Sequence, residues 1–242
     1  MFDFFLRALR NPMDYAGILK KHTLVFRERI DEGNGNFSFI FDTQTNLTWN
    51  AGQHGVFTLP RQNVSGKKWR AFSIASSAIE GEVRIGTTIP PQPSDFKQKM
   101  FNLNPKDTID MRGPFGEFHL NNSNMQVVAI AGGIGITPMR AMMVELTNDL
   151  HPGVSFELIY AGKDNYYAYH AACTEFNNHP NISITYVNTP DEVNQALDVA
   201  VNSHQNTATY YISGSPRMID AIQKRLSKAG IKKIVHDPFK GY

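Results

Sequence analysis

The chain has 242 residues, a length that suits two domains of roughly 100–150 residues each. Apolar residues make up 41% and charged residues 19%, which excludes wholesale disorder and provides material for real cores. Lys plus Arg (24) and Asp plus Glu (22) nearly balance, so nothing in the charge favours a nucleic-acid partner. The single cysteine, Cys173, excludes an internal disulfide and an iron–sulfur cluster held by this chain. A lone thiol is typical of a reducing compartment, so we expect a cytoplasmic location.

The first residues are apolar, but they are too few to cross a membrane. Residues 1–10 contain Phe, Leu and Arg at spacings that suit a short amphipathic helix. A membrane span needs about 20 apolar residues, and no stretch of the chain approaches that length. We expect residues 1–17 to form an N-terminal segment, partly helical, that packs on the body of the protein. The alternative is a peripheral surface that meets a membrane or a partner.

Residues 18–123 carry short β-rich runs separated by turn residues. We expect strands at 23–27, 37–41, 56–59, 70–73, 82–88 and 108–111, one helix at 94–103 and a turn at 113–116. Several short strands at this spacing predict a small antiparallel barrel or sandwich.

After a polar break at 121–124, strands and helices alternate, which predicts a parallel, doubly wound α/β sheet over residues 124–242. The run 127–131 is uninterrupted and apolar, as expected for a strand that is buried on both faces. We expect further strands at 156–160, 182–186, 208–212 and 234–235, and helices at 138–150, 168–176, 191–201 and 216–229.

A glycine-rich loop follows the first strand of this second domain. Gly132, Gly133 and Gly135 precede Thr137 and Pro138, and proline suits the first turn of a helix. Glycines allow the backbone to turn tightly and to approach a ligand closely, and a helix N-terminus suits a pyrophosphate. The loop therefore indicates a dinucleotide site.

Two segments of the first domain offer groups that suit a phosphate and a flat ring. Alternation along a strand places Arg70 and Phe72 on one face and Ser73 on the other. An arginine can grip a phosphate and a phenyl ring can stack on a flavin. Ser94 is a good N-cap for a helix that starts at Asp95, which predicts a second anion site.

Three further segments suit the second domain's ligand. Ser213 and Gly214 lie at another strand-to-helix switch, where the nicotinamide end of a dinucleotide would lie. Lys163, after the strand 156–160, suits a 2′-phosphate, whereas the neighbouring Asp164 suits ribose hydroxyls. Both cofactors stay open, and we favour NADPH. The C-terminal tail contains Phe239 and Tyr242, which indicates that it packs against protein or against a flavin.

Taken in order over residues 20–242, these segments resemble the ferredoxin–NADP reductase family. The resemblance implies a six-stranded antiparallel flavin barrel followed by a dinucleotide domain. It implies that Arg70 binds the FAD pyrophosphate, that Phe72 stacks on the isoalloxazine and that Ser73 faces N5. The remaining implied contacts are Ser94 with the backbone of Phe96 and Lys97 for the FAD phosphates, Gly132, Gly133, Gly135 and Thr137 for NAD(P)H, Ser213 and Gly214 for the nicotinamide end, and Phe239 or Tyr242 for the other flavin face.

The chain departs from the family at two places. Many relatives carry a cysteine where this chain has Ser213, and hydride transfer depends on geometry more than on that thiol, so we expect an effect on rate. The segment 89–93 contains three prolines and lacks the family's glycine, which affects the detailed FAD phosphate contacts.

The sequence therefore predicts an FAD-dependent oxidoreductase that transfers electrons between NAD(P)H and a separate carrier, an iron–sulfur protein such as ferredoxin or a flavodoxin. The alternatives are a ferric or flavin reductase that acts on small acceptors, and a non-enzymatic, flavin-binding electron-transfer component of a larger complex. The eight histidines show no metal-site spacing, so we expect no metal site.

Overall fold

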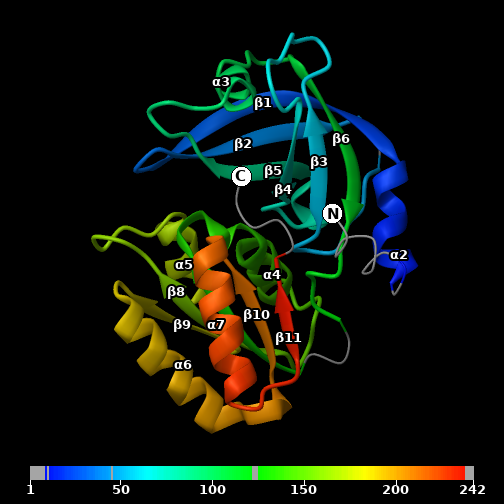
Figure 1. Cartoon of the computed structure of the whole chain (residues 1–242). Coiled ribbons are helices and arrows are strands. Elements are labelled where there is room, and N and C mark those ends of the chain that lie inside the picture. The colour runs from blue at the N-terminus through cyan, green and yellow to red at the C-terminus, as the bar shows by residue number, and fades with distance from the viewer. Residues whose placement is uncertain (1–8, 10, 45, 122–124, 238–242) are drawn as a thin grey trace. The chain divides into compact units, whose positions relative to one another are not determined.

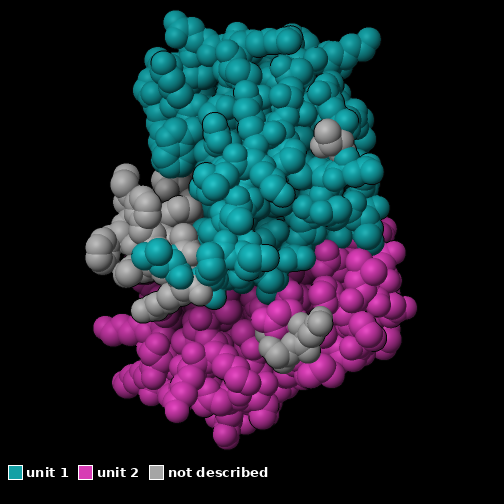
Figure 2. All heavy atoms as spheres, turned by 90° about the vertical axis from the view of Figure 1, so that its right-hand side faces the viewer, with its two compact units in different colours: residues 1–119, 242 teal, residues 120–241 magenta. Residues whose placement is uncertain are grey.

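The computed structural model describes residues 9, 11–44, 46–121 and 125–237 (Figure 1). They form two compact units, one ending at His119 and the other starting at Leu120, just before the polar segment 121–124 (Figure 2). Within the described ranges, every helix is too short or too polar to span a bilayer.

The first unit is a closed antiparallel sheet of six strands. They follow the spatial order β4-β3-β6-β1-β2-β5, and a bridge between Ile74 and Ile85 joins the end of β4 to β5. The expected six-stranded antiparallel barrel is therefore confirmed. The strands are β1 (Lys21–Gly33), β2 (Asn36–Thr43), β3 (His54–Thr58), β4 (Trp69–Ser73), β5 (Glu82–Thr88) and β6 (Thr108–Phe115).

Inward-facing aromatic and aliphatic side chains fill this barrel. Phe39, Phe41 and Phe57 are fully buried and belong to one shared hydrophobic core. Helix α3 (Asp95–Phe101) closes the core by burying Phe96 and Met100. The short 3-10 helix η2 (Ala78–Glu80) connects β4 to β5.

The prediction of a turn at 113–116 is wrong, because residues 113–115 continue strand β6. The pairing of β6 with β3 shifts register, since His54 pairs with Phe115 whereas Val56 pairs with Arg112. One extra residue on β6 is thus accommodated as a bulge. Gly113, at a φ of 138°, adopts the backbone conformation that the bulge requires.

Before the barrel, two short helical turns run along β6. They are α2 (Pro12–Tyr15) and η1 (Ala16–Leu19), and η1 packs on β6. The helix expected over residues 1–10 lies outside the described residues, except for Leu9, which is helical and exposed.

The second unit is a parallel sheet of five strands in the order β11-β10-β7-β8-β9. This confirms the expected doubly wound α/β fold, because α6 and α7 pack on one face while Figure 1 shows α4 on the other. The strands are β7 (Gln126–Gly132), β8 (Ser155–Ala161), β9 (Ile182–Val187), β10 (Thr209–Ser213) and β11 (Ile234–His236). The helices are α4 (Thr137–Thr147), α5 (His170–Phe176), α6 (Pro190–His204) and α7 (Pro216–Lys228), and the 3-10 turns are η3 (Gly133–Ile136) and η4 (Gln205–Thr207).

The single cysteine of the chain lies in α5 of this unit. The Cys173 side chain is fully buried, and burial raises the pKa of its thiol to about 12. The group is therefore a protonated core thiol at neutral pH.

Helix α6 offers a matched pair of positions that tests the packing of the second unit. Leu197 is fully buried against the sheet, whereas Val199, two positions on, is 64% exposed. We expect Leu197→Ala to lower the free energy of unfolding by about 2–5 kcal/mol, because it leaves a cavity in a closed core. Val199→Ala should change it by less than about 0.5 kcal/mol. Urea unfolding followed by far-ultraviolet circular dichroism measures both, and equal effects would contradict the assigned face of α6.

Candidate functional site

A buried guanidinium lies at the start of β4. Arg70 is 8% exposed, and its Nη1 donates to the backbone carbonyls of Lys67 and Trp69, both at 2.8 Å. Its Cζ lies 5.3 Å from the centre of the Phe96 ring. Burial lowers the pKa of Arg70, although an arginine remains charged at any physiological pH. The barrel therefore holds a fixed, partly desolvated positive charge here.

Two lysines share this environment, and the three cations define what we call the barrel cation cluster: Lys67, Arg70 and Lys97. Burial is the larger cause that lowers the pKa of Lys67 and of Lys97, and repulsion from Arg70 lowers both further. Lys97 Nζ also donates to the carbonyl of Thr88 at 2.8 Å, which ties α3 to the end of β5. A bound anion would relieve this repulsion among the three cations, so the cluster is a favourable anion-binding site.

The first turn of α3 organises the loop that carries Lys67. Ser94 is the N-cap as expected, and its hydroxyl accepts the N–H of Lys97 at 3.5 Å. The Asp95 carboxylate accepts the N–H of Ser65 at 2.6 Å and a hydrogen bond from Lys99 at 2.8 Å. The bond from Lys99 is the main cause that lowers the pKa of Asp95. Asp95 thus holds the loop before Lys67 against the helix.

Phe72 and Ser73 end strand β4, beside this cluster. The Phe72 ring is half-buried, with its centre 5.7 Å from that of Phe57 and 6.4 Å from that of Phe96. Ser73 is also half-buried and pairs with His54 of β3. The ring of Phe72 is therefore steadied by core aromatics while part of its surface stays accessible.

In the second unit, the glycine-rich loop lies between β7 and α4, as expected. Gly133 has a φ of +53°, and a side chain there would meet open space. The hydroxyl of Thr137 donates to the carbonyl of Ile134 at 3.1 Å, which closes the 3-10 turn onto the start of α4. Pro138 occupies the first turn of α4. The loop is thus held at its end, and its backbone is exposed at Gly133.

The loop after β10 lies directly against the glycine loop. A Cβ on Gly135 would lie 2.7 Å from the backbone of Ser213 and Gly214, and one on Gly132 would lie 2.3 Å from the sulfur of Met218. The contact at Gly135 explains why that position is glycine, because a side chain there would push the two loops apart, whereas at Gly132 the flexible Met218 side chain could move aside. The structure therefore brings Gly132, Gly133, Gly135 and Thr137 together with Ser213 and Gly214.

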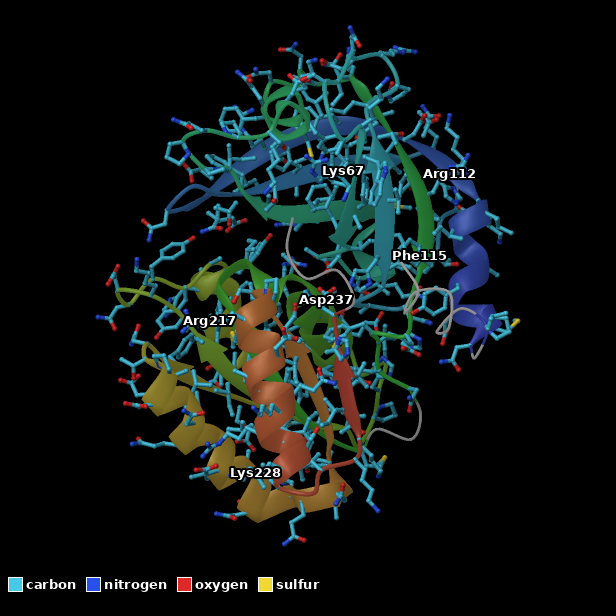
Figure 3. All side chains as sticks on the ribbon, in the orientation of Figure 1. Lys67, Arg112, Phe115, Arg217, Lys228 and Asp237 are labelled. Atoms are coloured by element: carbon cyan, nitrogen blue, oxygen red, sulfur yellow. The ribbon has the colours of Figure 1, made fainter. Side chains whose placement is uncertain are left out.

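Ser213 itself is turned toward an acidic partner. Its hydroxyl donates to the Asp237 carboxylate over 3.4 Å, and both residues are buried. Asp237 follows β11 at the carboxyl-end edge of the sheet (Figure 3). No local pattern in the sequence selects this carboxylate.

A buried tyrosine joins the glycine loop to the next loop along the sheet. The Tyr160 hydroxyl, at the end of β8, lies 3.1 Å from the carbonyl of Gly133 and 3.0 Å from that of Ala168. Burial raises the pKa of Tyr160, so the hydroxyl keeps its proton and acts as a donor. The Tyr160 ring also packs edge-on against Tyr167, with centres 5.2 Å apart. The one hydroxyl hydrogen of Tyr160 is thus shared between the carbonyl of Gly133 in the glycine loop and that of Ala168.

The other residues that the sequence predicts to contact the nucleotide or the flavin lie in an exposed loop or outside the described residues. Lys163 and Asp164 are exposed in the loop after β8, where a bridge joins Lys163 to Tyr166. Phe239 and Tyr242 lie outside the described residues.

Four residues with site contacts were missed by the sequence analysis: Lys67, Asp95, Tyr160 and Asp237. The lysine pair at 67–68, three residues before Arg70, was the one readable signal, because clustered cations beside a proposed phosphate site are informative. The other three act through contacts between segments far apart in the chain, and no local spacing indicates them.

Comparison with known proteins identifies a nucleotide-binding family match in the second unit. Residues 129–224 match the family described as the oxidoreductase NAD-binding domain. One component of the Na(+)-translocating NADH-quinone reductase of Actinobacillus succinogenes is 34% identical over 91 residues, which cover 34% of this chain and 22% of that protein. Its counterpart in Methylococcus capsulatus is 37% identical over 84 residues, covering 30% of this chain and 20% of that protein. The match thus spans about a fifth of these relatives.

Solved structures resemble the chain over nearly its whole length. The ferredoxin-NADP+ reductase of Plasmodium falciparum has a TM-score of 0.76 at 18% identity, covering 90% of this chain and 96% of that one. The cytochrome P450 reductase of Amycolatopsis has a TM-score of 0.75 at 21% identity, covering 91% of this chain and 70% of that one. Identities this low show the fold alone, whereas the family match concerns residues 129–224 of the second unit. The chain therefore has the fold of these reductases, and its residues 129–224 match the oxidoreductase NAD-binding domain.

Proposed function

We propose that this protein is an FAD-dependent oxidoreductase that transfers electrons between NAD(P)H and a separate redox carrier, an iron–sulfur protein or a flavodoxin. The observation that carries the proposal is the occurrence, in one chain, of the barrel cation cluster and of a glycine loop on an oxidoreductase NAD-binding domain. Each half suits one of the two cofactors, and the fold is shared with a ferredoxin-NADP+ reductase and with a flavohemoglobin solved with bound FAD.

The barrel cation cluster suits the FAD pyrophosphate. Arg70 repels both Lys67 and Lys97, so a bound pyrophosphate would remove an electrostatic cost as well as form charge-assisted hydrogen bonds. Ser94 and the first backbone amides of α3, at Phe96 and Lys97, would complete the phosphate contacts.

Phe72 and Ser73 suit the flavin ring. Phe72 offers a partly exposed ring that its aromatic neighbours already hold, so little rotational freedom is lost when a ring stacks on it. Ser73 would donate a hydrogen bond to N5 of the flavin. We assign the aromatic cover on the other flavin face to Phe239 or Tyr242.

The second unit would bind the nicotinamide dinucleotide. The backbone of Gly132, Gly133 and Gly135 would approach the pyrophosphate, with Thr137 at the start of α4. Ser213 and Gly214 would border the nicotinamide end. Lys163, exposed after β8, would pair with the 2′-phosphate that distinguishes NADPH from NADH.

Bound FAD would supply the redox chemistry, namely hydride acceptance from the nicotinamide and release of electrons one at a time to the carrier. The protein's part is to bind and orient the two cofactors, because hydride transfer needs no general acid–base pair.

A second candidate function has specific support in the names of the relatives. The matched component of the Na(+)-translocating NADH-quinone reductase is one part of a larger enzyme, and residues of this chain are similar to it. The chain would then deliver electrons from NADH within a complex, with no diffusing carrier. A ferric or flavin reductase that acts on small acceptors is the third candidate.

An anaerobic titration tests the proposed function. The purified protein should show a flavin absorbance spectrum, and NADPH or NADH added in parallel should bleach it. Subsequent reoxidation by a purified ferredoxin, a ferric chelate or a quinone then separates the three candidates. A colourless protein that does not take up FAD would refute the flavoenzyme proposal, and a yellow protein that neither nucleotide bleaches would leave only the non-enzymatic binding role. Lys163→Gln should weaken NADPH binding and leave NADH binding unchanged.

The barrel cation cluster predicts a charge-specific loss of FAD. Arg70→Gln should weaken FAD binding by about 10- to 100-fold, because a hydrogen bond to a charged group contributes about 1.5–3 kcal/mol. The exposed neighbour Lys68 provides the control, and Lys68→Gln should change FAD affinity little. Fluorescence of released FAD on dilution measures both variants. If the two variants hold FAD equally well, Arg70 does not bind the pyrophosphate.

The Tyr160 contact predicts a selective loss of nucleotide affinity. Tyr160→Phe removes the one hydroxyl hydrogen that the carbonyls of Gly133 and Ala168 share, so the glycine loop should loosen and KM for NAD(P)H should rise several-fold with FAD content unchanged. Tyr167→Phe is the matched control, because its hydroxyl lies 3.2 Å from the carbonyl of Val187, away from Gly133. Steady-state kinetics with a ferricyanide acceptor measures both. An equal rise in KM for the two variants would show a general loss of packing instead of a specific role for Tyr160.

A further inference from the structure

The segment before the barrel carries an apolar stripe that faces away from the protein. Its members are Pro12, Met13, Ala16 and Leu19 on α2 and η1, together with Leu9 just before them, and all five are exposed. The spacing of three or four residues from Pro12 and Met13 to Ala16 and on to Leu19 is that of one helical face. Asn11, at a φ of −129° and a ψ of 64°, separates Leu9 from this helical stretch. Leu9 is 78% exposed, Met13 88% and Leu19 81%. Among the described residues, these are the three most exposed large apolar side chains. We refer to these five residues as the outward stripe.

The opposite face of the segment is fixed to the barrel, so the direction of the stripe is determined. Tyr15 is 4% exposed, and its ring centre lies 6.2 Å from that of Phe115 in β6. The N–H of Gly116 donates to the carbonyl of Asp14 at 2.6 Å. The Asp14 carboxylate also lies 3.3 Å from Nε2 of His119.

Backbone contact reinforces this attachment on either side of Tyr15. A Cβ on Gly17 would lie 1.7 Å from the carbonyl oxygen of Pro114, so the two backbones touch. Asn11 donates to the Glu117 carboxylate at 2.5 Å. The outward stripe cannot turn inward without breaking these contacts, and its exposure is therefore a property of the fold.

The border of the stripe is cationic. Lys20 follows Leu19 and is exposed, and the next residue, Lys21, lies across from the exposed Arg112 in the pairing of β1 with β6. Arg112 and Phe115 occupy the same strand, beside α2 (Figure 3). Lys21 forms an ion pair with Asp110 at 2.7 Å, but the lysine side chain is 54% exposed and the carboxylate only 8%.

The two nearby carboxylates, Asp14 and Glu117, are held on the barrel side of the segment, away from the stripe. Asp14 lies against His119, and Glu117 accepts from Asn11. An apolar helical face bordered by exposed cations is the combination that binds at the surface of an anionic bilayer, where apolar side chains enter the acyl boundary and cations meet the headgroups.

We propose that the outward stripe, with Lys20 and Arg112 at its border, is a docking surface for an anionic phospholipid membrane. The stripe is a convex helical face, which suits insertion between lipids better than the closely fitting pocket that a protein anchor requires. The attachment is peripheral, and it holds the barrel at the membrane surface.

Vesicle co-sedimentation of the full-length protein, as purified, tests the proposal. The probes are phosphatidylcholine vesicles with and without phosphatidylglycerol. The protein should sediment with the anionic vesicles, and added salt should weaken the binding. The double variant Met13→Glu and Leu19→Glu should lower the partition coefficient at least about tenfold, since each change removes the burial of one large apolar side chain.

The chain provides a matched control. Ile79 in η2 is 50% exposed and Val199 in α6 is 64% exposed, so Ile79→Glu with Val199→Glu adds the same charge at other exposed apolar positions. This variant should bind anionic vesicles almost as well as the wild type. Lys20→Gln with Arg112→Gln should reduce the preference for phosphatidylglycerol. An unchanged far-ultraviolet circular dichroism spectrum and thermal midpoint show that each variant is folded.

Three results would overturn the proposal. Equal sedimentation of the stripe variant and the control variant would place lipid binding elsewhere on the protein. No sedimentation of the wild type would remove the membrane as the occupant. A concentration-dependent dimer, seen by light scattering and lost in the stripe variant while vesicles stay unbound, would identify the stripe as an interface between copies of this chain.

Discussion

The closure of the six-stranded sheet is the constraint on which the rest of the first unit depends. Strand β4 pairs with β3 along its length and then meets β5 through the bridge between Ile74 and Ile85. Closure leaves β4 no freedom to slide, because a shift of one residue would exchange its inward and outward side chains. Arg70 and Phe72 are therefore held on one face, next to α3, by the geometry of the whole barrel. Barrel closure, and not the local sequence around them, therefore fixes where these two side chains lie.

The second unit meets a different constraint. A parallel sheet brings the carboxyl ends of all its strands to one edge, and the connecting loops must share that edge. The loops after β7 and β10 come so close that Gly135 has no room for a side chain. The hydroxyl of Tyr160, at the end of the neighbouring strand β8, also contacts the carbonyl of Gly133 in the same loop. The loops at the ends of three neighbouring strands thus hold one another in place.

The sequence was sufficient to predict those elements whose signals lie within a few neighbouring residues. Alternating apolar residues, the glycine loop and the Ser94 cap each lie within a few positions, and the strands, the loop and the cap are found where these signals place them. The bulge in β6 was not readable, since Gly113 and Pro114 favour a turn when the pairing partner at His54 is unknown.

Lys67 and Asp95 escaped notice for a similar reason. Their importance comes from Arg70 and Ser65, which only folding brings to them. For the N-terminal segment the sequence left both burial and a peripheral surface open, and the contacts of Tyr15 show which face is buried.

The buried thiol in α5 has a practical consequence. Cys173 is the single cysteine of the chain, and at neutral pH it is both enclosed and protonated. Alkylating reagents attack thiolates that they can reach, so the native protein presents them with no such target at this position. A cysteine introduced at an exposed site would consequently be the sole reactive one. Spin labels or fluorophores can then be attached at one chosen point without first removing a natural thiol from the core.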